Sequence, residues 1–244
     1  MTGGNGSSGN GDGAKIRWQG VFLDFYGTIA SGDAQAVEAV CRQVIDDYGL
    51  TVDAPTLAVQ WGQRYFAAVE AVNCENFQCL KQIERDTLID ALLPLTGRIC
   101  VEKYIARFNE YLARPTIFEE VQEVLDALEV PVCVVSNADD HELRSAMAHH
   151  GLDIEFVVSS ETARSYKPEP GIFKTALELT GWSPDRVVHV GDSLHSDVGG
   201  ARGVGIKAAW VNRTCRIHDI GTAEPDYTWT DLRPLVALTS GDGR

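Results

Sequence analysis

The sequence predicts an α/β fold, a doubly wound parallel sheet with an inserted α-helical cap. Three observations lead to this prediction: short runs of apolar residues, helical periodicity between the runs, and one long helical stretch without a strand pattern. A continuous apolar run is typical of a strand covered on both faces, as in parallel sheets. The alternation of such strands with helices favours parallel strands joined by right-handed crossovers.

The α/β core is expected to come from two separate stretches of the chain, residues 15–32 and 113–244. The first predicted strand begins at Ile16 and ends at Asp24. The other strands are expected at Pro131–Val135, Val187–Val190, Ile206–Val211 and, shorter, Phe156–Ser159. Helical periodicity lies between them, at Phe118–Leu128, His141–His150 and Gly171–Thr180, the last followed by the helix-ending residue Gly181.

Residues 33–112 interrupt the alternation of strands and helices. This segment holds four helical patterns, at Ala34–Asp47, Ala54–Val72, Phe77–Leu93 and Val101–Tyr111. An all-helical block inserted after the first strand is expected to form a cap over the core. Residues 1–14 are rich in Gly, Ser and Asn, so they have no apolar surface to offset the entropy of ordering and are predicted to be a disordered tail.

The composition restricts the class of protein and of partner. The 244 residues are 44% hydrophobic and 23% charged, as in globular proteins. The formal net charge of -14 disfavours binding to nucleic acid or to an anionic membrane, because both need a basic surface. The chain shows no signal peptide or transmembrane pattern, and we expect a cytoplasmic protein. Its oligomeric state cannot be inferred from these properties.

Polar clusters follow several of the predicted strands, where ligands bind in open α/β sheets. Each cluster alone is also typical of ordinary turns and helix caps. Together and in this order they predict an active site. The clusters are Asp24-Phe25-Tyr26-Gly27-Thr28, Ser136-Asn137, Lys167-Pro168, and Gly191-Asp192-Ser193 followed by Asp197.

These residue types suit phosphoryl transfer through a covalent intermediate. A carboxylate such as Asp24 can act as the nucleophile and split one displacement into two. Lys167 supplies a point charge for the phosphoryl oxygens, and Asp192 can join Asp24 in holding Mg²⁺, which prefers oxygen ligands. The expected hydrogen-bond donors to the phosphate are Thr28, Ser136 and Asn137.

The four clusters resemble the motifs of the haloacid dehalogenase (HAD) superfamily. Asp24-x-Tyr26-Gly27-Thr28 is similar to its first motif, Ser136 to its second, Lys167 to its third, and Gly191-Asp192-x4-Asp197 to its fourth. The resemblance covers roughly Gly20 to Arg213 and implies a Rossmann-like core with a small helical cap. It also implies a Mg²⁺ site formed by Asp24, Asp192 and the backbone carbonyl of Tyr26, supported by Asp197 and Ser193.

Tyr26 and Asp192 favour different members of this superfamily. HAD phosphatases carry a second Asp at the position of Tyr26, and a tyrosine with a pKa of about 10 is a poor base at neutral pH. Haloacid dehalogenases carry Asp-x-Tyr-Gly-Thr, as here, because a leaving halide needs no proton. They are metal-independent, lack the counterpart of Asp192, and place an Arg after the cap Trp, where this chain has Gly62.

Asp192 leads us to expect a Mg²⁺-dependent phosphatase of a small phosphomonoester, acting through an aspartyl-phosphate on Asp24. The alternatives are a 2-haloacid dehalogenase that forms an ester on Asp24 without metal, related transferase or phosphonate-cleaving chemistry, and a binding protein for a phosphorylated ligand with a weakened catalytic site. The cap holds twelve acidic and seven basic residues between 33 and 112, which disfavours a large polyanionic substrate.

Two further groups are expected to be structural. Trp61, Tyr65 and Phe66 recur at helical spacing and are predicted to pack in the core of the cap. His189 is expected inside its strand, and His195 in the loop that follows it.

Overall fold

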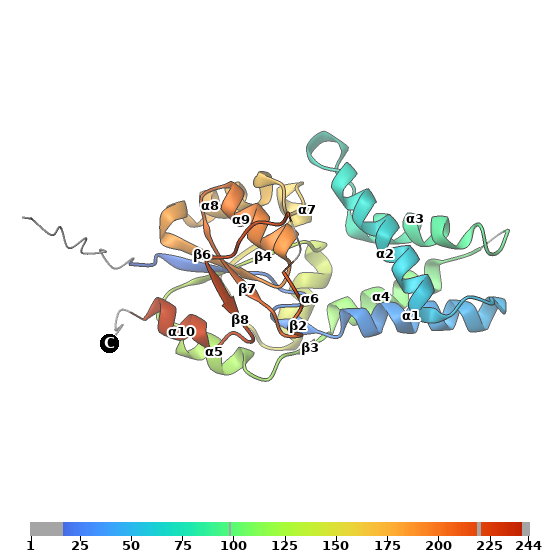
Figure 1. Cartoon of the computed structure of the whole chain (residues 1–244), viewed down its shortest axis with the longest axis horizontal. Helices are drawn as coiled ribbons and strands as arrows, with labels where there is room; N and C mark the ends of the chain where they lie inside the picture. Colours follow the sequence, from blue (N-terminus) through green and yellow to red (C-terminus); the bar gives the residue numbers. More distant parts are fainter. Residues whose placement is uncertain (1–16, 98, 219–220, 241–244) are drawn as a thin grey trace, which may run out of the picture.

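The computed structural model describes residues 17–97, 99–218 and 221–240. The predicted tail at 1–14 lies outside the described residues, as does Ile16, where the first strand was expected to begin. Figure 1 shows an α/β core and, to one side of it, a group of helices from the first half of the chain.

The core is built on a sheet of six strands in the order β5-β4-β1-β6-β7-β8, in which every neighbouring pair is parallel. The strands are β1 (Gly20–Leu23), β4 (Val132–Ser136), β5 (Phe156–Ser159), β6 (Val187–Gly191), β7 (Lys207–Val211) and β8 (Tyr227–Trp229). The doubly wound parallel sheet predicted from the apolar runs is confirmed. The edge strand β8 was not predicted, because three residues around Thr228 give no apolar run.

Both faces of the sheet are covered by helices. On one face lie α5 (Val121–Ala127), α6 (Asp140–His149) and α10 (Pro234–Thr239), and on the other lie α8 (Pro170–Thr180), the π-helical segment η3 (Leu194–Gly199) and α9 (Gly200–Gly203). The short helix α7 (Ser160–Ala163) follows β5, and two 3-10 turns, η1 (Cys74–Asn76) and η2 (Pro184–Arg186), complete the elements.

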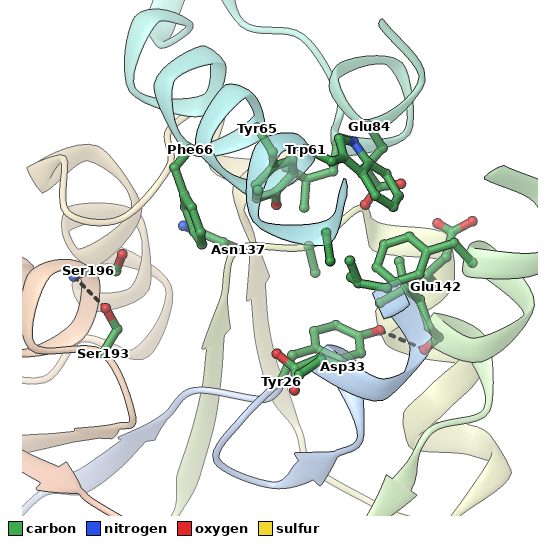
Figure 2. Close-up of a pocket in the computed structure, with 18 of the residues that line it drawn as sticks. Tyr26, Asp33, Trp61, Tyr65, Phe66, Glu84, Asn137, Glu142, Ser193 and Ser196 are labelled. Carbon is green, nitrogen blue, oxygen red and sulfur yellow. Dashed lines mark hydrogen bonds between the residues drawn. The ribbon is translucent and has the colours of Figure 1, made fainter. Parts of the chain in front are cut away.

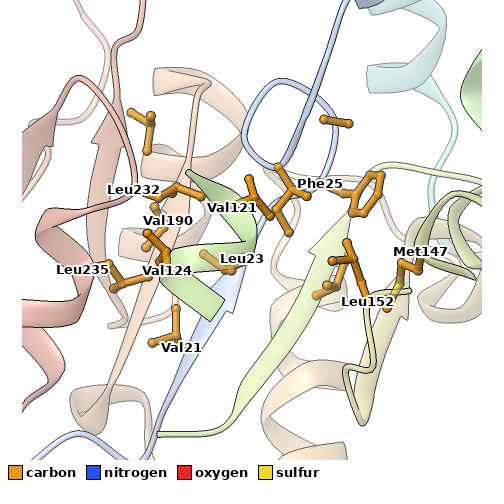
Figure 3. Close-up of a cluster of buried hydrophobic side chains, with 14 of the residues drawn as sticks. Val21, Leu23, Phe25, Val121, Val124, Met147, Leu152, Val190, Leu232 and Leu235 are labelled. Carbon is orange, nitrogen blue, oxygen red and sulfur yellow. The ribbon is translucent and has the colours of Figure 1, made fainter. Parts of the chain in front are cut away.

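Strand β1 shows why its sequence is apolar at every position. Val21 and Leu23 pack into the cluster shown in Figure 3, whereas Phe22 packs into the cluster on the opposite face. All three side chains are fully buried. Burying such a side chain contributes roughly 1.5–3 kcal/mol, so packing on both faces holds in place the strand that Asp24 follows.

The cap consists of α1 (Asp33–Tyr48), α2 (Ala54–Ala71), α3 (Leu80–Leu92) and α4 (Glu102–Ala113). It enters and leaves the core through a two-stranded antiparallel sheet of β2 (Ala30–Ser31) and β3 (Thr116–Ile117). The four helices share an apolar cluster of their own that includes Leu57, Leu88 and Tyr104. The predicted helical insertion is confirmed, and the boundaries proposed for it, residues 33 and 112, stay a prediction.

Hydrogen bonds fasten the cap to the core. The carboxylate of Asp139, in the core, accepts from the backbone N–H groups of Leu80 at 2.7 Å and Lys81 at 2.9 Å. These two residues begin α3, so Asp139 satisfies N–H groups that have no partner inside the helix. Tyr166, also in the core, donates its hydroxyl to the carbonyl oxygen of Gln78 at 2.6 Å. No helix in these described ranges has the length and apolarity needed to cross a membrane.

Candidate active site

Three adjacent strands bring the predicted site residues together. Asp24 follows β1, Ser136 ends β4 and Asp192 follows β6. Because β1 pairs with β4 on one side and β6 on the other, these strand ends lie next to one another. The site therefore lies at the carboxyl edge of the sheet, where the sequence pattern placed it.

Lys167 connects two of the carboxylates. Its Nζ lies 2.6 Å from Oδ1 of Asp24 and 2.6 Å from Oδ1 of Asp197, and it also donates to the carbonyl oxygen of Val135 at 3.1 Å. Lys167 and Asp197 are almost fully buried, as is Asp24. The arrangement holds the ammonium beside the nucleophile that we predict.

Asn137 fixes the position of Lys167. Its Oδ1 accepts from the backbone N–H of Lys167 at 2.7 Å, and its Nδ2 donates to the carbonyl oxygen of the same residue at 3.1 Å. Both ends of its amide are thus engaged with the backbone of Lys167, while the side chain also lines the cavity described below, and its expected role as a donor to phosphate stays a prediction. Its side chain thus acts on the site through the lysine.

Several groups orient the carboxylates. Ser136 donates its hydroxyl to Oδ1 of Asp24 at 3.2 Å. The backbone N–H of Ser193 donates to Oδ2 of Asp197 at 2.9 Å, and Nε2 of His189 lies 2.9 Å from Oδ1 of the same carboxylate. The prediction that His189 lies inside its strand is confirmed, whereas its contact with Asp197 was not foreseen.

The carboxylates outnumber the buried cation, and their pKa values show it. Burial raises the pKa of Asp24, and the charge of Asp197 adds to the effect while Lys167 opposes it. Burial, with Asp197 and Asp24, raises the pKa of Asp192 to about 7. Burial works against the ionised form of Asp197 too, but Lys167 and His189 hold its pKa below the usual range.

The donor set fits a hard divalent cation. Asp24, Asp192 and Asp197 each offer an oxygen within 4.8 Å of the others. Gly27, at φ 93, leaves room for this arrangement, because a Cβ there would lie 2.7 Å from the carboxylate of Asp192. Gly191 does the same for Asp197, whose carboxylate carbon would lie 2.1 Å from an added Cβ. Oxygen ligands and excess negative charge are the properties that Mg²⁺ requires.

The surroundings of Tyr26 make its hydroxyl unsuited to acid–base catalysis. Its hydroxyl donates to the carbonyl oxygen of Leu112, at the end of the cap, at 2.7 Å. Burial raises the pKa of Tyr26 well above its ordinary value of 10, and nearby groups, including the carboxylates of Glu142 and Glu84, add to the shift. Its phenol is therefore an even poorer base at neutral pH than the sequence suggested.

Thr28 and Ser193 occupy different places at the site. Thr28 is fully buried, and its hydroxyl has no hydrogen-bond partner in the described part of the chain. Ser193 lines the cavity described below and accepts from the backbone N–H of Ser196 at 3.1 Å, which caps η3. The segment that carries Asp197 is thus held at its first turn.

A cavity of about 740 Å³ opens between this edge of the sheet and the cap. Figure 2 shows Tyr26 at the bottom of the view, with Trp61, Tyr65 and Glu84 on the cap helices at the top. The carboxylates among its lining residues are Asp33, Glu84, Asp139, Glu142 and Asp192, and the basic residue among them is Arg216. A substrate therefore meets apolar walls and an excess of acidic groups.

The predicted cap aromatics divide between the core and this cavity. Trp61 is buried, packs against Phe108 and donates its indole N–H to the hydroxyl of Thr87 at 3.1 Å, as expected for a core residue. Phe66 is 66% exposed and lines the cavity, so its assignment to the core was wrong. It lies on α2 and contributes an exposed aromatic side chain to the wall of the cavity.

Two arginines near the site were not predicted to have a role there. Arg216 lies 3.6 Å from Oδ2 of Asp192 and donates to its backbone carbonyl. Arg213 pairs with Glu120 at 2.7 Å and donates to the carbonyl oxygen of Thr28 at 2.8 Å, which supports the loop after β1. Both follow β7, and their position after a strand of the same sheet is the signal that could have identified them.

The comparisons with known proteins identify the family of the chain. The haloacid dehalogenase-like hydrolase family matches residues 18–205. The (S)-2-haloacid dehalogenase 2 of Pseudomonas sp. strain CBS-3 is 25% identical over 228 residues, covering 90% of this chain and 95% of that protein. A phosphoserine phosphatase of Thermus thermophilus is 38% identical over 91 residues, 37% of this chain and 35% of that protein. The L-2-haloacid dehalogenase of Xanthobacter autotrophicus superposes with a TM-score of 0.77 at 21% identity, covering 92% of this chain and 99% of that one.

These similarities establish the family of the chain but not the reaction that it catalyses. The dehalogenase relative is similar over nearly its whole length, whereas the phosphatase relative is similar over about a third of its own. They therefore favour the dehalogenase alternative over the expected phosphatase, which they do not confirm. The family match covers most of the chain and includes Asp24, Ser136, Lys167 and Asp197. The chain belongs to the haloacid dehalogenase-like hydrolases.

Proposed function

We propose that the protein is a Mg²⁺-dependent phosphatase of a small phosphomonoester, with Asp24 as the covalent nucleophile. The observation that carries this proposal is the cluster of Asp24, Asp192 and Asp197, in which the buried Lys167 pairs with Asp24 and Asp197 and leaves Asp192 to a cation. A metal-independent reaction on an anionic substrate has little use for a third carboxylate at this place, since it would repel the substrate. The same excess negative charge favours the binding of a divalent cation.

In the first step, a carboxylate oxygen of Asp24 attacks phosphorus, and the bond from phosphorus to the ester oxygen breaks. Lys167, 2.6 Å from Oδ1 of Asp24, orients the nucleophile and neutralises charge that gathers on the phosphoryl oxygens. Ser136 holds the same carboxylate oxygen from the neighbouring strand. In the second step, water attacks the aspartyl-phosphate, which releases phosphate and restores Asp24.

The cation would be held by the carboxylates of Asp24 and Asp192 and by the backbone carbonyl of Tyr26. When bound, Mg²⁺ supplies positive charge to the phosphoryl oxygens. Asp197 has a different task in this proposal, because its carboxylate is already bonded to Lys167, His189 and the backbone of Ser193. It keeps the lysine charged and in place.

The weak point of this catalyst is proton transfer. The leaving oxygen needs a proton donor, and the attacking water needs a proton acceptor. The raised pKa of Tyr26 makes its phenol unsuited to either role. General acid–base assistance is typically worth about 10²–10⁴ in rate. We therefore expect slow turnover and a preference for leaving groups that need little protonation.

A 2-haloacid dehalogenase is the second candidate. It is favoured by the full-length similarity to the Pseudomonas enzyme and by Tyr26 at the second position after the nucleophile. In this reaction Asp24 displaces the halide, and water then hydrolyses the ester. The carboxylates around the cavity oppose this candidate, because a haloacid carboxylate would have Arg216 as its one basic partner among the lining residues.

One assay separates these candidates. The purified protein is given p-nitrophenyl phosphate or 2-chloropropionate, each with Mg²⁺ or with EDTA, and the Asp24→Asn variant is the control. We expect phosphate release that needs Mg²⁺ and Asp24. Halide release that is indifferent to EDTA would establish the dehalogenase instead, and Mg²⁺-dependent phosphate binding without turnover would favour a binding protein with a weakened site.

A further inference from the structure

One wall of the cavity holds a buried carboxylate without a partner. Glu84 lies on α3 of the cap, lines the cavity and is 3% exposed. Its Oε2 accepts no hydrogen bond from the residues that the structure describes. A buried carboxylate that is neither paired nor hydrogen-bonded is costly, so its presence at a cavity wall points to a ligand that satisfies it.

A second carboxylate faces Glu84 from the core. Glu142, in the first turn of α6, lines the same cavity and is 8% exposed. Burial raises the pKa of Glu84 to about 8, and the charges of Asp139 and Glu142 add to the shift while Lys81 opposes it. The carboxylate of Asp139 is occupied by the N–H groups of α3, which leaves Glu84 and Glu142 as the acidic pair open to a ligand.

The surroundings of this pair suit an organic cation. Figure 2 shows Glu84 beside Trp61 and Tyr65, with Glu142 lower on the same side of the cavity and Ser193 and Ser196 on the other side. Aromatic faces attract cations, and the attraction increases when water is excluded. Of the lining residues, Arg216 carries positive charge, and it lies at Asp192 rather than at this wall.

We propose that Glu84 and Glu142 bind an ammonium group on the leaving portion of the substrate, which makes the substrate class the phosphomonoesters of amino alcohols. This inference rests on the proposed phosphatase function. The phosphoryl group then lies at Asp24 and Lys167, and the cationic end extends under the cap. Opposite charges at the two ends of the substrate match the lysine at one end of the site and the acidic pair at the other.

The test compares pairs of substrates of the same shape. Phosphocholine and 3,3-dimethylbutyl phosphate differ by nitrogen against carbon at one atom, and O-phosphoethanolamine and propyl phosphate differ by an ammonium against a methyl group. We expect kcat/KM, measured with Mg²⁺, to be at least about tenfold higher for the cationic member of one pair, a difference that one close charge contact can supply. Equal values in both pairs, or a preference for the neutral member, would overturn the proposal.

Variants identify the residues responsible. Glu84→Gln and Glu142→Gln each remove a carboxyl group that can ionise against the bound ammonium, while keeping the side-chain volume, and each should bring the ratio of kcat/KM toward one. Glu110→Gln is the matched control, because Glu110 is exposed on α4, does not line the cavity and should leave the ratio unchanged. A full preference retained by both cavity variants would overturn the assignment, provided that thermal unfolding shows them to be folded.

A binding measurement keeps the two proposals apart. If p-nitrophenyl phosphate and all four esters release no phosphate, the phosphatase proposal fails, and the ammonium site is then tested by calorimetry with choline against 3,3-dimethylbutanol. Binding of choline by the wild type that is lost in Glu84→Gln would support the site. Absence of choline binding would overturn it, whatever the reaction.

Discussion

Asp24 and Tyr26 lie two residues apart in the chain, yet the structure gives them opposite surroundings. Asp24 is turned toward Lys167 and Ser136 in the core, whereas the hydroxyl of Tyr26 is bonded to Leu112 at the end of the cap. The side chain at the second position therefore links cap and core and does not itself supply a base to the nucleophile. This separation predicts where the catalyst can be improved.

Replacing Tyr26 with Asp should increase Mg²⁺-dependent phosphatase turnover, up to about the 10²–10⁴ that acid–base assistance is worth. Tyr26→Phe is the matched control, because it loses the same bond to Leu112 without gaining a carboxylate. Steady-state kinetics with p-nitrophenyl phosphate measures both. A Tyr26→Asp protein that is folded and no faster than Tyr26→Phe would argue against the phosphatase. A dehalogenase should instead lose halide release when a charge enters this position.

The raised pKa of Glu84 predicts that the free energy of unfolding depends on pH. Between its ordinary pKa of 4.5 and the value of about 8 in the folded protein, Glu84 binds a proton in the folded state and not in the unfolded state. The contribution of this residue to the free energy of unfolding must therefore fall as pH rises through this window. Glu84→Gln has no proton to lose, so the variant should be more stable than the wild type at pH 8, and by less at pH 5.

Urea denaturation at the two pH values, with Glu110→Gln beside it, checks this prediction. The stabilising effect of Glu84→Gln is expected to be a few kcal/mol at most at pH 8, because water entering the cavity reduces the cost of the buried charge. A difference between wild type and variant that is independent of pH would show that Glu84 ionises normally.

At the scale of the elements, the strand ends were predictable and the contacts between cap and core were not. Asp24 and Ser136 directly follow an apolar run, and Asp192 follows one after Gly191, so the runs themselves mark their places. Glu84 and Glu142 are separated by 58 positions along the chain and line one cavity only because the fold brings the start of α3 to the start of α6, which no local pattern encodes. Arg216 differs from them, because its position after β7 was a signal that the sequence offered.

The contact of Asp139 with α3 gives a prediction at this scale. Asp139→Ala removes the acceptor from two N–H groups at the start of the helix, and the loss of a helix cap typically costs about 0.5–2 kcal/mol. We expect faster hydrogen exchange at the amides of Leu80 and Lys81 and a lower free energy of unfolding. Asp153→Ala, at an exposed carboxylate of the core, is the control. Unchanged exchange at the first turn of α3 would mean that this cap contributes nothing in solution.

At the scale of the whole molecule, the sheet and the cap supply different halves of the site. The sheet supplies the charged centre of Asp24, Lys167 and Asp197, and the cap supplies most of the apolar wall. The buried β-strands fix the first half rigidly, because Val21, Phe22 and Leu23 are packed on both faces. The similarity to dehalogenases over nearly the whole chain is therefore similarity of this scaffold, while the reaction depends on a few side chains at its edge.

Mg²⁺ should stabilise the whole molecule if the carboxylate cluster binds it. A ligand that binds the folded state alone, at a hundredfold excess over its Kd, raises the free energy of unfolding by about 2.7 kcal/mol. Asp192→Asn should lose most of this response, because it replaces a charged carboxylate ligand by a neutral amide and so removes one of the three charges. Thermal unfolding with increasing Mg²⁺ measures the effect. If the wild type and Asp192→Asn respond equally, the ion is not bound at this cluster.

The carboxylate of Asp139 also decides how the protein can be rebuilt. A chimaera could exchange residues 33–112 for the insert of a related enzyme. Its new α3 would then meet Asp139 of this core, which is not the residue that caps that helix in its own protein. The inserted helices therefore depend on a residue of the core and are not an independent structural unit. A design that moves them to another hydrolase must also include the loop after β4. The start of α3 and the carboxylate that caps it then stay together.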